Sequence, residues 1–289
     1  MRVRRSGFGI VLAGLALLAG PGAAREATPR GAQAVAHQRV LPLEGGRNFR
    51  DLGGYPAGGG RHVVWGKLFR SGSMHGLTAR DYAYLQTRGI VVVCDFRDTR
   101  ERTAEPAAWP AGAAPRVLSD DYQLDMKQFF PAGDPKGWTA EQARVAMTAS
   151  YPHMLGQFEG QYRRMFAELL AGHAPLAFNC SAGKDRSGVA AALLLTALGV
   201  PRETVISDYL LTNRYLDQNT MRASPASANS PLAQAPAGVR EALGAADRRY
   251  IAAAFKVLDT YPGGARGWLK DKMGLSAADI ARLRALYTA

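Results

Sequence analysis

Apolar residues occur along the chain in two alternating patterns, short continuous runs and longer stretches with a helical period. Residues 90–94 and 175–178 are short apolar runs, which are typical of strands buried on both faces of a sheet. Residues 189–195 are apolar throughout, and residues 155–169 repeat large apolar side chains at helical spacing. The side chains expected on the buried face of this last stretch are Leu155, Phe158, Tyr162, Phe166 and Leu169. The alternation predicts an α/β fold with a central, mostly parallel sheet flanked by helices.

Capping residues indicate where several helices begin and end. A hydroxyl followed three residues later by an acid or an amide occurs at Thr78 with Asp81, at Thr139 with Gln142, and at Ser276 with Asp279. Gly89 is expected to end the first of these helices, and Pro152 is expected to interrupt the second. A further short strand is expected at residues 116–118.

Residues 179–188 read Asn-Cys-Ser-Ala-Gly-Lys-Asp-Arg-Ser-Gly and connect the strand at 175–178 to the helix that follows. A helix N-terminus presents free N–H groups and a partial positive charge, so a loop around it can hold a phosphate dianion. Arg186 would add two parallel hydrogen bonds to phosphate oxygens. The same field favours the thiolate form of Cys180. The spacing of these two residues therefore predicts a phosphate-binding loop with a cysteine nucleophile.

The remaining loop residues also have expected roles. Ser187 can donate a hydrogen bond to the sulfur of Cys180 and help it leave from a phosphocysteine. The residues expected to hold the phosphate are Ser181, Ala182, Gly183, Lys184, Asp185 and Arg186.

The loop resembles the C-x5-R signature of cysteine-dependent phosphatases, in the Gly-Lys-Asp-Arg form of an atypical bacterial tyrosine and dual-specificity phosphatase family. Further segments resemble motifs of that family: residues 47–55, 68–71, 94–98 with Glu101, and 208–213. The resemblance covers residues 41–289. It implies the cysteine-phosphatase-like fold, hydrolysis of phosphate monoesters through a phosphocysteine intermediate, and no metal or organic cofactor. Asn179 departs from the family, which usually has histidine before the nucleophile.

The substrate class stays open at this level. Phosphotyrosine suits a deep cleft, and phosphoserine or phosphothreonine are further possibilities. Lys184 resembles the lysine of phosphatases that also accept phosphoinositides, and the formal net charge of +12 favours highly charged ligands. The alternatives are a secreted phosphate-recognition pseudoenzyme and a thiol enzyme that transfers sulfur. Intact Cys180, Arg186 and Ser187 favour the hydrolase.

The proton donor for the leaving group is open among three acidic residues. Asp95 closes the strand at 90–94 and is expected at the same sheet edge as Cys180. Asp185 lies inside the loop, and the resemblance implies a catalytic role for it. Asp121 follows the strand at 116–118. The expected order is Asp95, then Asp185, then Asp121. The alternative for Asp95 is an ion pair with Arg97 or Arg70.

Residues 1–24 have a basic start, an apolar run and a small-residue end, which predicts a signal peptide and export to the periplasm or outside the cell. Residues 25–40 are expected to form a mobile leader, and residues 41–289 one catalytic domain. Within that domain, residues 223–237 are rich in Ala, Ser and Pro, which is typical of a surface linker or of a flexible part of a lid.

The chain has two cysteines, Cys94 and Cys180. Each ends an expected strand, so adjacent strands would permit a reversible disulfide that protects the nucleophile. The alternative is that Cys94 is a small buried residue that faces away from the site. The histidines lack metal-ligand spacing, and no clustered basic and aromatic pattern indicates nucleic-acid binding. The expected partner is a phosphorylated protein or a phosphoinositide substrate.

Overall fold

The computed structural model describes residue 7 and residues 37–112, 114–125, 130, 133–217 and 234–289. The predicted signal peptide, most of the predicted leader and most of the segment 223–237 lie outside the described residues. The last residues expected in the leader, 37–40, are part of the fold, because Val40 pairs with Arg50 as an isolated antiparallel bridge.

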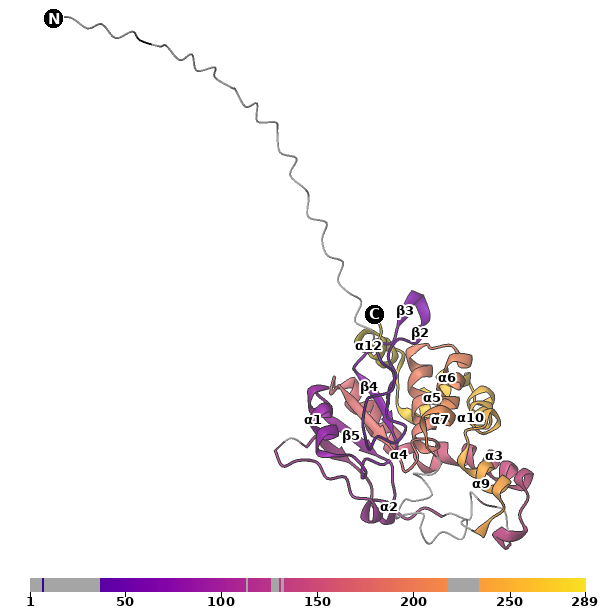
Figure 1. Cartoon of the computed structure of the whole chain (residues 1–289). Helices are drawn as coiled ribbons and strands as arrows, with labels where there is room; N and C mark the ends of the chain where they lie inside the picture. Colours follow the sequence, from indigo (N-terminus) through magenta and orange to yellow (C-terminus); the bar gives the residue numbers. More distant parts are fainter. Residues whose placement is uncertain (1–6, 8–36, 113, 126–129, 131–132, 218–233) are drawn as a thin grey trace, which may run out of the picture. The chain divides into compact units, whose positions relative to one another are not determined.

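The core of the fold is a five-stranded sheet (Figure 1). Its strand order is β1 (Arg50–Asp51), β4 (Leu68–Ser71), β7 (Leu176–Asn179), β5 (Val92–Asp95) and β6 (Arg116–Leu118). β1 is antiparallel to β4, and the other neighbours are parallel. The predicted α/β class with a mostly parallel sheet is confirmed. A separate hairpin consists of β2 (Pro56–Ala57) and β3 (Arg61–His62), joined by the 3-10 turn η1 (Gly58–Gly60).

Helices cover both faces of the sheet. On one face, Tyr82 and Leu85 of α1 (Ala79–Thr87) pack with Phe69, Val93 and Ala177. The larger core lies on the other face and includes side chains of α4 (Glu159–Leu170) and α5 (Arg186–Leu198). The other described helices are α2 (Thr99–Ala104), η3 (Pro135–Gly137), α3 (Ala140–Gln157), α6 (Arg202–Leu210), α7 (Thr212–Tyr215), α9 (Ala237–Gly244), α10 (Arg248–Thr260), α11 (Gly264–Met273) and α12 (Ala277–Tyr287).

The predicted helix starts are confirmed, since each of the three pairs forms a capping box at the start of α1, α3 or α12. The predicted interruption at Pro152 is wrong, because α3 continues through it to Gln157. A proline removes one N–H from the helix, and here Tyr151, Met154 and Leu155 around it are buried. Packing of these neighbours offsets the lost hydrogen bond. The apolar stripe expected after Pro152 is buried as predicted, but it spans the end of α3 and all of α4.

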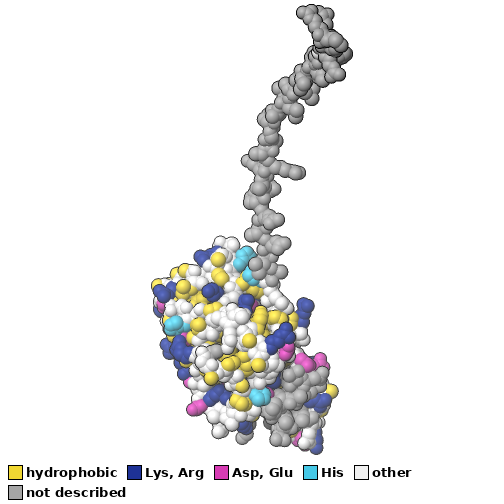
Figure 2. Space-filling model, turned by 60° about the vertical axis from the view of Figure 1, so that its left-hand side comes forward, with side chains coloured by type: hydrophobic (Ala, Val, Ile, Leu, Met, Phe, Trp, Pro, Cys, Tyr) yellow, Lys and Arg dark blue, Asp and Glu magenta, His cyan; other side chains and the backbone are white. Residues whose placement is uncertain are grey.

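The surface shows no single concentration of basic residues in the view of Figure 2. Lys and Arg side chains are spread over that face among hydrophobic and uncharged ones. No helix within the described residues is long and apolar enough to cross a membrane.

Candidate active site

The predicted phosphate loop lies at the carboxyl end of the central strand. β7 ends at Asn179 and α5 begins at Arg186, so the intervening residues connect a strand end to a helix N-terminus. Cys180 is 1% exposed and Arg186 is 7% exposed. Carboxyl ends of parallel strands are where open α/β sheets bind ligands. The fold therefore places the predicted nucleophile and the predicted arginine in one loop at the expected edge.

Side chains from the N-terminal part of the domain hold the carbonyl groups of this loop. Asn48 Nδ2 donates to the carbonyls of Ala182 and Gly183, at 3.1 Å each. Arg70 Nη2 donates to the carbonyl of Gly183 at 2.8 Å. The carbonyl of Ser181 accepts from the Ser73 N–H at 2.9 Å and from Arg47 Nη1 at 3.3 Å. With its carbonyls bound from outside, the loop can present its N–H groups to an anion.

The loop passes so close to the backbone of Ser71 and Gly72 that glycine is required at position 183. The φ of Gly183 is +67°, a left-handed conformation that favours glycine. A Cβ at this position would lie 2.6 Å from the Ser71 carbonyl group and from the Gly72 nitrogen. Any larger residue would push the loop away from β4.

A buried ion cluster supports the same side of the loop. Asp208 accepts from Arg50 Nε at 3.0 Å, from Arg70 Nη1 at 2.7 Å and from Tyr55 Oη at 2.8 Å. Arg50 and Arg70 are fully buried, and Asp208 is 1% exposed. Burial alone would raise the pKa of Asp208, but the two guanidinium groups outweigh it and hold the pKa well below its usual range. Arg70 thus connects this charge cluster to the loop carbonyls, although its buried Nε has no hydrogen-bond partner within the described residues.

Glu101 fixes the guanidinium of Arg186. The two carboxylate oxygens accept from Nη1 at 2.6 Å and from Nη2 at 2.7 Å. Arg186 Nη1 also donates to the Phe96 carbonyl and to Tyr122 Oη, at 3.0 Å each. Burial opposes the charge of Glu101, but the adjacent Arg186 lowers the pKa of Glu101 to about 2. An ionised partner in bidentate contact holds the planar guanidinium in one orientation.

Known proteins are similar to this chain over most of its length. A sequence model of a tyrosine phosphatase family matches residues 41–289. The chain belongs to this family. A Cupriavidus necator protein that carries a tyrosine-protein phosphatase name is 35% identical over 249 residues, 84% of this chain and 86% of its own. The triple specificity protein phosphatase PtpB of Mycobacterium tuberculosis is 28% identical over 281 residues, 85% of this chain and 98% of its own. The protein is therefore a phosphatase of the protein-tyrosine type.

Asp95 of this phosphatase is an anchoring residue in the structure. Its Oδ2 accepts from Arg97 Nη2 at 2.7 Å, and its Oδ1 accepts from Arg97 Nε at 2.9 Å and from Asn179 Nδ2 at 3.0 Å. The ion pair with Arg97 that was the alternative for Asp95 is thus present. It also holds Asn179, the residue before the nucleophile.

The other two candidate acids have different surroundings. Asp185 is partly exposed, with its Oδ1 accepting from Tyr151 Oη at 2.6 Å. Oδ2 of Asp185 makes no hydrogen bond within the described part of the chain. The side chain of Asp121 is 89% exposed and pairs with Arg102 at 2.6 Å. Its neighbour Tyr122 is the residue of this segment that contacts Arg186.

Lys184 and Ser187 are both buried. Lys184 Nζ donates to the carbonyl of Leu243 at the end of α9. Ser187 Oγ lies 3.5 Å from the Ser71 carbonyl oxygen, the long limit of a hydrogen bond. The predicted bond from Ser187 to the sulfur of Cys180 is not among the hydrogen bonds of the described residues, and its role stays a prediction.

The permissive geometry expected for a disulfide between Cys94 and Cys180 is wrong. Cys94 is in register with Phe178, two residues before Cys180. Ordinary strand spacings then separate the two Cα atoms by about 8 Å, whereas a disulfide requires less than about 7 Å. Both cysteines are free and buried. Burial raises the pKa of Cys94 to about 12, so its thiol stays protonated.

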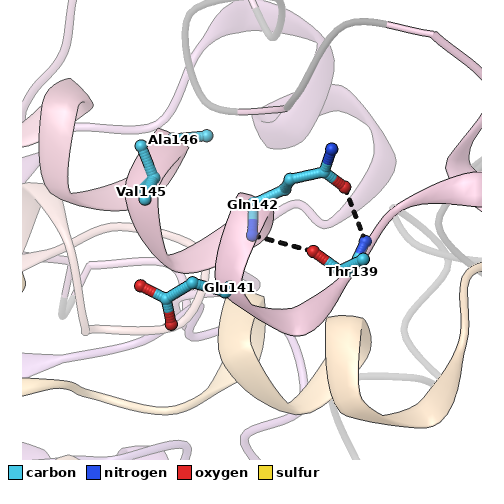
Figure 3. A pocket seen from close by; sticks show the side chains of 5 residues that line it. All are labelled: Thr139, Glu141, Gln142, Val145 and Ala146. Carbon is cyan, nitrogen blue, oxygen red and sulfur yellow. Dashed lines mark hydrogen bonds between the residues drawn. The ribbon is translucent and has the colours of Figure 1, made fainter.

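A cavity of about 550 Å³ lies along the first turns of α3 (Figure 3). It is lined by Thr139, Glu141, Gln142, Val145 and Ala146, and no residue of the catalytic loop reaches it. No group of His, Cys, Asp and Glu in the described ranges could hold a metal ion.

Several residues at the site carried no individual role in the sequence. Asn48, Glu101 and Asp208 lie in segments that resemble the family, but the pattern gave no reason to pair them with the loop. Tyr122 and Tyr151 carried no signal, because their neighbours in the sequence form no motif that would assign them a role. Only the fold brings them to Arg186 and Asp185.

Proposed function

We propose that this phosphatase hydrolyses phosphotyrosine in proteins through a phosphocysteine intermediate on Cys180. The observation that carries the proposal is the loop itself. Its carbonyls are held from outside, and Arg186 is fixed by both oxygens of Glu101. Such a loop matches a tetrahedral phosphate on one side and leaves the cysteine at its base as the nucleophile.

In the first step, the thiolate of Cys180 attacks phosphorus as the bond between phosphorus and the ester oxygen breaks. Arg186 and the loop N–H groups stabilise the charge on the transferring phosphoryl oxygens. The leaving phenolate takes a proton from a carboxyl group. In the second step, water attacks phosphorus, gives its proton to that carboxylate, and releases phosphate with the thiolate restored.

Asp185 is the residue that we assign to this proton transfer. Tyr151 fixes its Oδ1, which leaves Oδ2 to exchange a proton with the leaving group. Tyr209 Oη lies 2.5 Å from Tyr151 Oη. Because the Tyr151 proton is donated to Asp185, Tyr209 is the donor in its contact with Tyr151. Asp95 lacks this freedom, since Arg97 and Asn179 bond both of its oxygens.

The nucleophile is tested with Cys180→Ser. Rapid mixing with an aryl phosphate should give a burst of phenol in the parent enzyme and acid-stable radioactive phosphate on the protein. The variant should retain phosphate binding and the parent's unfolding midpoint but show neither signal, because a serine hydroxyl stays protonated. Turnover near the parent rate in the variant would overturn the mechanism. A parent that binds phosphate without any burst would be the recognition pseudoenzyme.

The proton donor is tested with Asp185→Asn and Asp95→Asn on aryl phosphates whose phenols differ in acidity. Loss of the proton donor should slow esters of weakly acidic phenols most, by roughly 10²–10⁴-fold, and leave activated esters nearly unaffected. We expect this steeper dependence for Asp185→Asn alone. A steeper dependence for Asp95→Asn alone would assign the role to Asp95.

We also propose a wider substrate range and export of the protein. The name of the Mycobacterium relative suggests more than one specificity, so phosphoserine peptides and phosphoinositides belong in the substrate screen. Export to the periplasm or beyond is proposed from the pattern of residues 1–24. Fractionation of cells, followed by sequencing of the mature N-terminus, tests it; a cytosolic protein that begins at residue 1 would contradict it.

A further inference from the structure

Lys184 is buried although it belongs to a loop built for an exposed anion. Its side chain is 3% exposed. Nζ donates to the Leu243 carbonyl, and it lies 3.3 Å from the Ala245 carbonyl oxygen and 3.5 Å from Asp185 Oδ1. Leu243 is in the last turn of α9, and Ala245 follows that helix. The end of a helix carries unpaired carbonyls and a partial negative charge. Lys184 therefore caps α9 from the catalytic loop.

Two other side chains hold the same short stretch of backbone. Asn213 donates from Nδ2 to the Ala246 carbonyl at 2.8 Å and accepts the Ala246 N–H at 2.7 Å. Tyr250 Oη donates to the Ala242 carbonyl at 2.8 Å. The side chains of Lys184, Asn213 and Tyr250, here called the anchors, all bind main-chain atoms at the C-terminal end of α9.

The anchors matter because α9 is short. It has eight residues, and helices of this length are not stable alone. Val239 and Ala242 pack in a small cluster with Trp138 and Ala143. At the end that borders the catalytic loop, Leu243 and Ala246 pack against the main core, and the three side chains add hydrogen bonds to the main chain. Removal of one anchor should loosen this end first.

We propose that Lys184 is a positioning residue that fixes residues 237–246, the α9 wall, beside the catalytic loop for binding of phosphotyrosine peptides. It does not serve as a ligand for a second substrate phosphate. Moving Nζ to such a phosphate would break its part-buried hydrogen bonds to the carbonyls of Leu243 and Ala245. The proposal rests on the phosphotyrosine phosphatase function proposed above, and it assigns the α9 wall to binding of the peptide.

The test compares Lys184→Met with Asn213→Ala, with Lys256→Met on the exposed surface of α10 as the matched control. Hydrogen exchange of the α9 wall is measured first, without substrate. Lys184→Met and Asn213→Ala should each speed exchange of the wall amides at least about tenfold, and Lys256→Met should not. This readout needs no turnover, so it stays informative if the proposed phosphatase activity fails.

Kinetics then distinguishes a positioning role from a phosphate ligand. Lys184→Met should raise KM for a phosphotyrosine peptide about tenfold, because the wall must be ordered on binding, and raise KM for a small aryl phosphate far less. Lys184→Arg should restore part of both the exchange protection and the peptide KM. Unchanged exchange in Lys184→Met, together with a selective loss on a phosphoinositide, would overturn the proposal. Equal losses on peptide and aryl phosphate would overturn it as well.

Discussion

The catalytic loop is held in different ways on its two sides. On the sheet side, Asn48, Arg70 and the buried Asp208 cluster hold the loop through charged and amide side chains. On the α9 side, Lys184 and Asn213 reach main-chain groups of a short helix. Three ionised groups without access to water have little freedom to rearrange, whereas a helix end held by a few hydrogen bonds can open locally. The difference indicates that the phosphate loop is rigid and that the α9 wall beside it adapts more easily.

The largest effect is expected on the sheet side, from Asp208→Asn. The change keeps the shape of the side chain but leaves Arg50 and Arg70 buried without a counter-charge. Breaking a buried ion pair in this way costs about 3–5 kcal/mol. Denaturant unfolding should show this loss, with Asp259→Asn as the control, because the Arg202–Asp259 pair is exposed. A loss below about 1 kcal/mol for both variants would mean that the cluster is not the rigid support described here.

A smaller but specific effect is expected from Arg186→Lys. An ammonium group cannot reproduce the bidentate contact with Glu101 or the two parallel bonds to a phosphoryl group. We expect kcat to fall roughly 10²–10³-fold, together with some loss of stability, because Glu101 loses its bidentate partner. Arg202→Lys, which makes the same change in an exposed ion pair outside the site, is the control. A near-normal kcat in Arg186→Lys would make Arg186 a structural residue only.

The same contrast explains what the sequence could predict. The parallel sheet, the capped helices and the loop with Cys180 and Arg186 follow from local patterns, and the structure contains them. The motif segments on the sheet side were visible through their resemblance to the family's motifs. The wall contact of Lys184 was not visible, because its acceptors are carbonyls that every residue carries. The order of the candidate acids also depends on Tyr151 and Arg97, whose partners only the fold decides.

Acid should weaken the Glu101 contact while the contact of Lys184 with the α9 carbonyls, which do not titrate, stays in place. The pKa of Glu101 falls from 4.5 to about 2 in the folded protein. A carboxyl group whose pKa is lower in the folded protein than in the unfolded chain stabilises the fold fully at pH values above its unfolded-state pKa. This stabilisation is lost as the pH falls toward its folded-state pKa. Glu101 should therefore contribute up to about 3 kcal/mol above pH 4.5, and progressively less down to pH 2.

The measurement is the unfolding free energy of the parent and of Glu101→Gln between pH 6 and pH 2. Other carboxylates, including Asp208, titrate in both proteins, so the difference between the two curves isolates Glu101. We expect that difference to shrink as the pH falls through this window, while hydrogen exchange of residues 237–246 changes equally in both proteins. A difference that stays constant with pH would show that the ion pair of Glu101 with Arg186 adds no net stability, and that Glu101 only orients the guanidinium.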